Sequence, residues 1–154
     1  MGGTVEKALN DLGMTLPDAP APAANYVPFV RTGSLLFISG QISRSPSGEE
    51  VLGTLGAGIE VAEGQRAAEI CALNILAQAK AAVGDLDSIV RLVRLNGFVQ
   101  ATADFTQHPQ VINGASNLMA TVLGERGRHS RCAVGVISLP FGVAVEIDAV
   151  LEVA

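Results

Sequence analysis

The sequence has no tryptophan, and aromatic residues make up only 4% of its 154 positions. Hydrophobic residues still account for 49% of the chain, so a sizeable core has to be built from Val, Leu, Ile and Ala. The length suits one domain rather than two. We therefore predict a single domain over residues 1–154, in which residues 1–25 form an N-terminal extension or arm.

Cysteine is equally scarce. Cys71 and Cys132 belong to no CxxC motif and to no Cys/His cluster. Isolated cysteines in apolar surroundings are more often buried thiols than halves of a disulfide or ligands of a metal. We therefore expect two buried thiols and no metal site.

Basic residues are fewer than acidic ones: the sequence has ten Lys and Arg and fifteen Asp and Glu, which gives a net charge of −5. Nucleic-acid-binding domains usually carry a basic total or a basic stripe. Arg126, Arg128 and Arg131 do cluster with His129, but three arginines make a small patch. This balance argues against nucleic acid as a partner.

Long apolar runs are missing too. No segment approaches the ~18 consecutive apolar residues that mark a membrane span, and the opening MGGTVEKALNDLG lacks the apolar stretch of a secretory signal. The glycine-rich VLGTLGAG lacks the Lys-Ser/Thr of a P-loop, so it predicts a turn rather than a phosphate site. We expect a cytoplasmic protein with no membrane partner.

Strand and helix patterns alternate along the chain. Apolar residues at helical spacing predict helices over residues 4–12, 61–83 and 109–123. Strand patterns cover residues 35–42 and 89–100, a further segment near Phe29, and two final strands joined at 139–142. Arg91 and Arg94 differ in parity, so a regular strand would direct them to opposite faces. The order favours an α+β fold of two layers with two helices on one face of a sheet.

The last strand predicts what covers that sheet. Val145, Ile147 and Ala149 share one face, whereas Glu146 and Asp148 fall on the other. Such alternation is typical of a strand with one buried face and one mixed face. A mixed second face in so apolar a chain favours an oligomer.

Arg131 is the most informative residue, because it opens an apolar strand. An unpaired charge is costly to bury, so its guanidinium has to reach water, a carboxylate or a ligand. Its planar fork suits bidentate capture of a carboxylate. A structural salt bridge to Glu146, to Asp148 or to an acid on a partner chain remains open at this point.

Glu146 could orient water or move a proton, or it could be an exposed or salt-bridged strand carboxylate. In a tight hairpin it would lie opposite about Gly135, roughly 13 Å along the strand from Arg131 at ~3.3 Å per residue. The two side chains would then share a site only through a cleft or through two subunits.

Other reactive residue types offer weaker signals. Neither His108 nor His129 has the Asp or Cys spacing of a triad or a metal site. Cys132 has the opposite strand parity to Arg131, which favours a packed thiol. Ser39 lacks the GxSxG elbow of a nucleophile, so we expect its hydroxyl to form a hydrogen bond.

Three segments carry a resemblance to a known family: FISGQI, INGASNLM and SRCAVGVISLPFGVAVEIDAV. They resemble the signature regions of the RidA/YjgF/YER057c/UK114 family, also called endoribonuclease L-PSP. The longer N-terminus, with PAPAANYVPFVRTGSLLFISGQ, is similar to the family's subgroup of longer bacterial members.

The resemblance implies a chorismate-mutase-like α+β fold with a mixed β-sheet, assembled as a homotrimer with ligand clefts between subunits. It implies hydrolytic deamination of reactive enamines and imines, such as 2-aminoacrylate, to 2-keto acids and ammonia. The chain would then be a 2-iminobutanoate/2-iminopropanoate deaminase-like hydrolase. It would need no metal or organic cofactor, and its partners would be a small carboxylate-bearing imine and further copies of itself.

The resemblance also assigns roles to single residues. Arg131 matches the arginine that grips the substrate carboxylate, and Glu146 matches the glutamate near the attacking water. The remaining matches would line the cleft: Ser39 and Gly40 at its border, Asn113 from the second long helix, and Tyr26 in the position of a tyrosine that reaches in from a neighbouring chain. The family's cysteine, two positions after the arginine, is Ala133 here, so any role that needs a thiol there is lost.

Two other functions stay open from the sequence. A non-catalytic small-carboxylate-binding or chaperone-like module would use the same cleft without turnover. An endoribonuclease or translation inhibitor, the role in the family's older name, is disfavoured by the acidic balance and by the lack of a His/Lys catalytic set.

Overall fold

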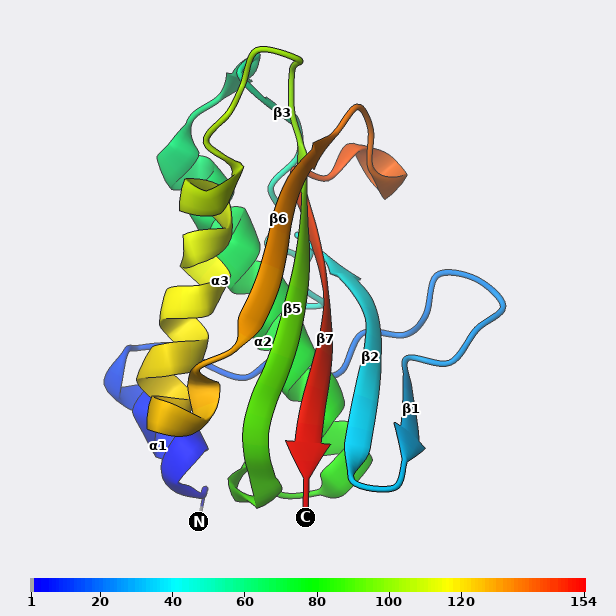
Figure 1. The fold of residues 1–154 in the computed structure, drawn as a ribbon, viewed down its shortest axis with the longest axis vertical. Helices are drawn as coiled ribbons and strands as arrows, with labels where there is room; N and C mark the ends of the chain where they lie inside the picture. The colour runs from blue at the N-terminus through cyan, green and yellow to red at the C-terminus, as the bar shows by residue number, and fades with distance from the viewer. Residues whose placement is uncertain (1) are drawn as a thin grey trace.

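The computed structural model, which describes residues 2–154, is built on a five-stranded sheet of order β1-β2-β7-β5-β6 (Figure 1). β5 and β6 run parallel and the other neighbours run antiparallel, so the sheet is mixed. Its strands are β1 (Phe29–Thr32), β2 (Leu35–Ile42), β5 (Ile89–Gln100), β6 (Ser130–Val136) and β7 (Val145–Val153). The short strands β3 (Thr54–Leu55) and β4 (Gly58–Ile59) form a separate pair.

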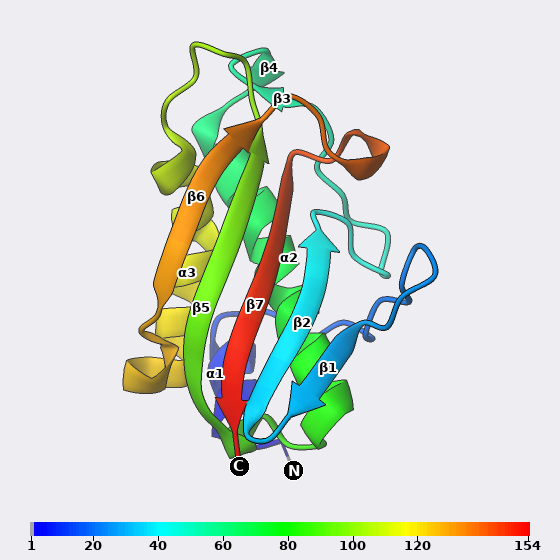
Figure 2. The same cartoon turned by 45° about the vertical axis from the view of Figure 1, so that its right-hand side comes forward.

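The helices lie on one side of this sheet (Figure 2). α2 (Val61–Val83) and α3 (His108–Leu123) pack on the sheet, and α1 (Thr4–Asp11) packs against α3. Single helical turns are η1 (Leu86–Ser88), η2 (Gly124–Gly127) and η3 (Pro140–Gly142). The predicted α+β fold is confirmed, with three helices rather than two on that side, and the homotrimer stays a prediction. None of the helices in residues 2–154 is long and apolar enough to cross a bilayer.

The predicted pairing of the two final strands is wrong, because β5 lies between β6 and β7. β6 follows α3, and a strand–helix–strand unit places its second strand parallel to the first, here beside β5. The segment that contains η3 then crosses the end of β5, so that β7 starts on the other side (Figure 2).

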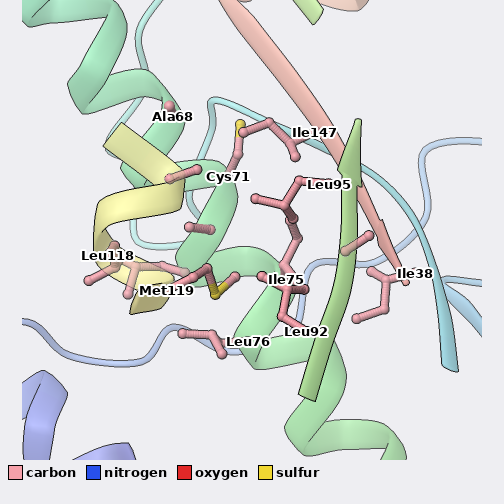
Figure 3. Packing of buried hydrophobic residues seen from close by; sticks show 14 of the residues in the cluster. Ile38, Ala68, Cys71, Ile75, Leu76, Leu92, Leu95, Leu118, Met119 and Ile147 are labelled. Carbon is pink, nitrogen blue, oxygen red and sulfur yellow. The ribbon is translucent and has the colours of Figure 1, made fainter. Parts of the chain in front are cut away.

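The core lies between the sheet and the two long helices (Figure 3). Leu92 and Leu95 of β5 and Ile147 of β7 meet Ile75 of α2, and Met119 of α3 closes the layer. All five side chains are fully buried. Burial of one such side chain contributes roughly 1.5–3 kcal/mol, so apolar packing is what holds the helices on the sheet.

The two cysteines differ in their surroundings. Cys71 is fully buried in this core, and its thiol donates to the carbonyl of Val145 at 3.5 Å. Burial raises the pKa of Cys71 well above its usual value, and the charge of Glu146 raises it further. The predicted buried thiol is thus confirmed for Cys71 but wrong for Cys132, which is exposed because it lies on the sheet face that no helix covers.

That outer face carries both arginines of β5. The register pairs Arg91 with Glu152 and Arg94 with Val150, two residues on the same face of β7. A regular strand would direct the two arginines to opposite faces, but this strand is irregular: the ladder shifts at Val93 and inserts an extra residue between them. The predicted alternation of β7 is confirmed, since its odd-numbered residues are buried and its even-numbered ones are partly exposed.

At Gly114, α3 lies close against the backbone of α2. A Cβ at this position would lie 2.8 Å from the carbonyl carbon of Gln65 and 2.9 Å from its Cα, which is too close for non-bonded carbon atoms. One turn earlier, Gln65 donates through Nε2 to the carbonyl of Gln110 at 2.9 Å. Glycine at position 114 therefore sets the distance between the two helices.

We expect Gly114→Ala to lower the free energy of unfolding by about 2 kcal/mol, because the added methyl overpacks a backbone contact. The loss should occur although alanine has the higher helix propensity. Urea unfolding measures it, with the exposed Asn117→Ala on the same helix as control, expected within about 0.5 kcal/mol of the parent. Equal stability of Gly114→Ala and the parent would contradict the close helix contact.

Candidate active site

Glu146 lines a cleft on the β2 side of the sheet. It lies on β7 between Ile42 of β2 and Phe98 of β5, and it is half-buried. The cleft has a volume of about 750 Å³ and a mostly apolar lining. Residues of β2, α2, η3 and the segment before β1 form its walls.

The segment before β1 forms the outer wall. Gln78 of α2 donates through Nε2 to the carbonyl of Pro20 at 2.6 Å, which holds this segment against the helix. Tyr26 lines the cleft from there, together with neighbouring prolines and alanines. Tyr26 thus faces the cleft of its own chain, and its reach into a neighbouring chain stays a prediction.

Ser39 and Gly40 lie at an irregularity of β2, where the ladder with β7 shifts register. Ser39 Oγ donates to the carbonyl of Val27 at 2.8 Å, so the predicted hydrogen bond of this hydroxyl is present. At Gly40, which lines the cleft, a Cβ would lie 3.0 Å from Cδ of Glu146. The missing side chain of Gly40 therefore leaves the room that the Glu146 carboxyl occupies.

The surroundings of Glu146 disfavour its charged form. Partial burial raises the pKa of Glu146, and the charge of Asp148 on the same strand face raises it further. Within residues 2–154 no cation forms an ion pair with Glu146. A carboxyl with a raised pKa is suited to proton exchange near neutral pH.

Phe141 of η3 also lines the cleft, in a left-handed backbone conformation with φ of 60°. This conformation costs a non-glycine residue about 1–2 kcal/mol. The guanidinium carbon of Arg44 lies 5.1 Å from the centre of the Phe141 ring, within cation–π range. Residues held in such conformations cluster at functional sites, but the turn sequence itself carries no sign of this role.

Arg131 lies on the opposite edge strand, on the face that packs against α3. Its Nη1 donates to Ser116 Oγ at 3.0 Å, and its Nη2 donates to the carbonyl of Pro109 at 3.2 Å. No acid in residues 2–154 pairs with Arg131, so the alternative of a salt bridge to Glu146 or Asp148 is ruled out within one chain. The acid on a partner chain remains as the structural alternative.

Asn113 is the predicted site residue nearest to Arg131 along α3. It follows Pro109 by one turn and precedes Ser116 by three residues, so the three share one stripe of the helix. Asn113 is partly buried there. The predicted site residues therefore fall into two groups: Arg131 with Asn113 between β6 and α3, and Glu146 with Ser39, Gly40 and Tyr26 around the cleft.

These two groups do not meet within one chain. Arg131 is in register with Leu95 and Ala149, which are buried under the helices, whereas Glu146 is in register with Phe98 on the outer face. Two strand spacings of ~4.8 Å and three residues of ~3.3 Å separate the Cα atoms by about 14 Å. The prediction that Arg131 and Glu146 do not touch is confirmed, although the reason is an intervening strand rather than a hairpin.

The residues next to Arg131 on β6 alternate in direction. Cys132 lies on the outer face, where Nη2 of Arg94 is 3.4 Å from its sulfur. Ala133, in the position of the family's cysteine, is in register with the buried Gly97 on the helix side. Cys132 thus does not replace that cysteine.

The arginines around His129 do not form a common basic surface. Arg126 donates to the carbonyls of Asp87 in η1 and Ile89 at the start of β5, and Arg128 pairs with Glu125 at 3.4 Å. Among residues 2–154 no group of three or more His, Cys, Asp or Glu side chains could hold a metal ion.

Ser116 and His129 join the Arg131 group, although the sequence reading assigned them no role. Ser116 Oγ lies 2.9 Å from His129 Nε2, and His129 Nδ1 lies 2.6 Å from the carbonyl of Gly127. Two signals in the sequence are consistent with this: Ser116 shares the helix stripe of Asn113, and His129 has the strand parity of Arg131.

Residues 6–147 match the model of a family described as "YjgF/chorismate mutase-like, putative endoribonuclease". The chain is similar to Protein TCP17 of Trypanosoma cruzi, with 51% identity over 97% of this chain and 94% of that protein. It is also similar to the crystal structure of Atu1372 from Agrobacterium tumefaciens, a protein of unknown function. The TM-score is 0.92 and the identity 54%, over 98% of this chain and 93% of that one.

More distant crystal structures share the fold. RidA from the Antarctic bacterium Psychrobacter sp. PAMC 21119 is 29% identical with a TM-score of 0.63, over 88% of this chain and 94% of that one. TdcF of E. coli, described with bound serine, is 25% identical with a TM-score of 0.63, over 90% of this chain and 93% of that one.

Since the pKa of Glu146 is raised in the folded chain, its ionised form costs stability near neutral pH, whereas the protonated form at low pH does not. We expect Glu146→Gln to raise Tm by about 2 °C near neutral pH, and the gain to vanish towards about pH 4. Thermal unfolding across this pH range measures the effect.

Glu152→Gln is the matched control, because it removes the same charge from the same strand face but beside Arg91. It should not raise Tm. A lower Tm of Glu146→Gln near neutral pH would show that the Glu146 carboxylate is stabilised rather than strained.

Proposed function

This chain belongs to the YjgF/chorismate mutase-like family, and from that premise we propose that it hydrolyses reactive imines and enamines of amino acids, such as 2-aminoacrylate, to 2-keto acids and ammonia. Arg131 would hold the substrate carboxylate, and Glu146 would exchange protons with the attacking water. Ser39, Gly40, Asn113 and Tyr26 would shape the site.

The observation that carries the proposal is that Arg131 has unused N–H donors and no carboxylate partner among residues 2–154. A guanidinium has five N–H donors, and Ser116 and Pro109 engage only two of those of Arg131. A partly buried cation without a carboxylate is unfavourable. A substrate carboxylate would supply the missing anion and could accept two parallel N–H bonds from the fork.

For imine hydrolysis the protein has to position the substrate and water and to transfer protons. An enamine first takes up a proton at its terminal carbon and becomes a protonated imine. Water then adds to the C=N carbon, and a proton passes from the added oxygen to the nitrogen. The C–N bond breaks as ammonia leaves, and loss of the remaining hydroxyl proton forms the keto group. The raised pKa of Glu146 supports a role in these proton transfers. No covalent nucleophile is needed, because the imine carbon is already electrophilic.

The two groups of site residues would meet between subunits of a homotrimer. One subunit would supply Arg131 and Asn113 from its β6 edge, and its neighbour would supply Glu146 and Gly40. The outer sheet face supports association, because Val30, Phe37 and Val134 are 53%, 44% and 44% exposed there. Exposed apolar side chains on a sheet face that no helix covers are typical of an interface.

The size of the cleft bears on the substrate. The bound serine of E. coli TdcF supports a ligand of amino-acid size in this family. The cleft here, at about 750 Å³ with a mostly apolar lining, exceeds what 2-aminoacrylate requires. Imines derived from amino acids with larger apolar side chains would fill it better.

Binding without turnover is the second candidate, because serine is a carboxylate ligand and not an imine. The same Arg131 grip would serve it. An endoribonuclease role, which the name of the family model carries, fits less well. The net charge is −5, and Arg126 and Arg128 are engaged with separate local partners.

We expect Arg131→Ala to lower kcat/KM for imine hydrolysis by about 100-fold or more, because each hydrogen bond to a charged group contributes about 1.5–3 kcal/mol. An amino-acid oxidase would generate the imine, and keto-acid release would be timed. Arg131→Lys should retain part of the rate, and Arg128→Ala, which loses only an exposed ion pair, should retain all of it.

Unchanged hydrolysis by an Arg131→Ala variant of unaltered oligomeric state would refute the carboxylate grip. Wild-type protein that accelerates no imine, tested over several amino acids, yet binds their keto acids, would favour the binding module instead.

A composite site predicts complementation between defective subunits. Arg131→Ala and Glu146→Gln should each be poorly active alone, but co-expressed in equal amounts they should regain about a quarter of the wild-type rate, since one site in four combines two intact residues. Each variant co-expressed with itself is the control. Absence of recovery in verified mixed oligomers would show that Arg131 of one subunit and Glu146 of another do not act in the same site.

A further inference from the structure

We propose that Ser116 and His129 are positioning residues that orient Arg131 through a hydrogen-bond relay of fixed direction, and so set the affinity of the site for a substrate carboxylate. The inference rests on the proposed grip of Arg131. It extends the site to two side chains that do not themselves touch the substrate.

The direction of the relay follows from the anchor of His129. Its Nδ1 lies 2.6 Å from the carbonyl oxygen of Gly127. A carbonyl only accepts, so Nδ1 carries the proton and, in the neutral ring, Nε2 is an acceptor. Ser116 Oγ, 2.9 Å away, therefore donates its single proton to Nε2.

Because the hydroxyl proton of Ser116 is donated to His129, Ser116 can only accept a hydrogen bond from Arg131. With its proton turned to the imidazole, the hydroxyl presents lone pairs to Nη1 of Arg131, 3.0 Å away. The relay thus runs from Arg131 through Ser116 and His129 to Gly127, and each of these contacts pairs a donor with an acceptor. In the reverse direction Nε2 would carry the proton, and the lone pair of Nδ1 would face the carbonyl oxygen of Gly127, so two acceptors would meet at 2.6 Å.

The relay also fixes the plane of the guanidinium. Arg131 is held at two points on α3, the hydroxyl of Ser116 and the carbonyl of Pro109. A planar fork held in place loses less conformational freedom when it binds a carboxylate, which improves affinity without a new contact.

A Ser–His pair at this distance also resembles a base-activated nucleophile. The contact with Arg131 argues against that role, because a hydrogen bond from a cationic guanidinium draws electron density from the hydroxyl oxygen and makes it a weaker nucleophile. Ser116 is also only partly exposed in the middle of α3. Orientation of Arg131 is the role that accounts for all three contacts.

The backbone around Gly127 holds the residues of the relay close to α3. Gly127 ends η2, and a Cβ there would lie 2.8 Å from the carbonyl carbon of Met119, so this turn packs tightly on α3. His129 immediately precedes β6 and Arg131 is the second residue of that strand. Both side chains contact Ser116 of α3. The ring and the guanidinium are thus presented to the same side of α3.

The first test compares the affinity for 2-oxobutanoate, a product-like keto acid, by calorimetry. Ser116→Ala should raise Kd about tenfold, the effect of one hydrogen bond to a charged group. Ser116→Thr, which keeps the hydroxyl, should rescue most of the binding. Thr121→Ala, which removes a hydroxyl that bonds only to the Asn117 carbonyl on the same helix, should bind as wild type. In turnover the loss should appear in KM rather than kcat.

The second test reads the direction of the relay without any ligand. The chain has two histidines, so ¹⁵N side-chain spectra recorded at about pH 8, where a histidine ring is neutral, can be assigned with His129→Gln. The expected His129 tautomer carries its proton on Nδ1. A proton on Nε2 would overturn the proposal.

The outcomes separate this inference from the proposed function. Wild-type protein that binds 2-oxobutanoate but hydrolyses no imine would refute the deaminase, while a binding loss confined to Ser116→Ala would still support the relay. Equal affinities of Ser116→Ala and Thr121→Ala, with hydrolysis intact, would refute the relay alone. Absence of both 2-oxobutanoate binding and imine hydrolysis in the wild type would overturn both. Size-exclusion chromatography checks that the variants keep the parent's oligomeric state.

Discussion

The close contact of α2 and α3 at Gly114 is the constraint on which the Arg131 group depends. α3 can approach the backbone of Gln65 only because position 114 has no side chain. The same helix carries Ser116 and the carbonyl of Pro109, the two acceptors that hold Arg131. A helix displaced by a larger residue at 114 would shift both acceptors relative to β6, so the packing of the layer and the orientation of the guanidinium are set together.

A second glycine has a similar effect at the other edge of the sheet, where Gly40 leaves room for the carboxyl of Glu146. In both places a missing side chain lets a functional group take a position that ordinary packing would close. The energetic consequence differs, however. Arg131 gains two hydrogen bonds, whereas Glu146 is left partly buried beside Asp148, which raises its pKa. Only the second group is poised to change its protonation state.

Most of the fold could be predicted from the sequence, because the apolar periodicity of α2, β2 and β5 runs the full length of each element. The pairing of the final strands could not, since a local pattern does not reveal that β5 lies between them. Arg131 and Glu146 stood out as charges in apolar strands, and the family resemblance supplied their proposed roles. Ser116 and His129 could not be found in the same way, because their contacts join a helix to a strand, and the sequence contains no distance between layers.

The charges left without a partner in one chain indicate what would complete the site. Arg131 lacks an anion, and Glu146 lacks a cation, yet the sheet keeps them on opposite faces, so one cannot neutralise the other. A protonated 2-imino acid carries a carboxylate next to a positively charged C=N group. Its negative end would match the oriented fork of Arg131, and its positive end would match the carboxylate of Glu146 from a neighbouring subunit. A substrate with this charge pattern would relieve the electrostatic cost of both residues at once, which neither an acid nor a base alone could do.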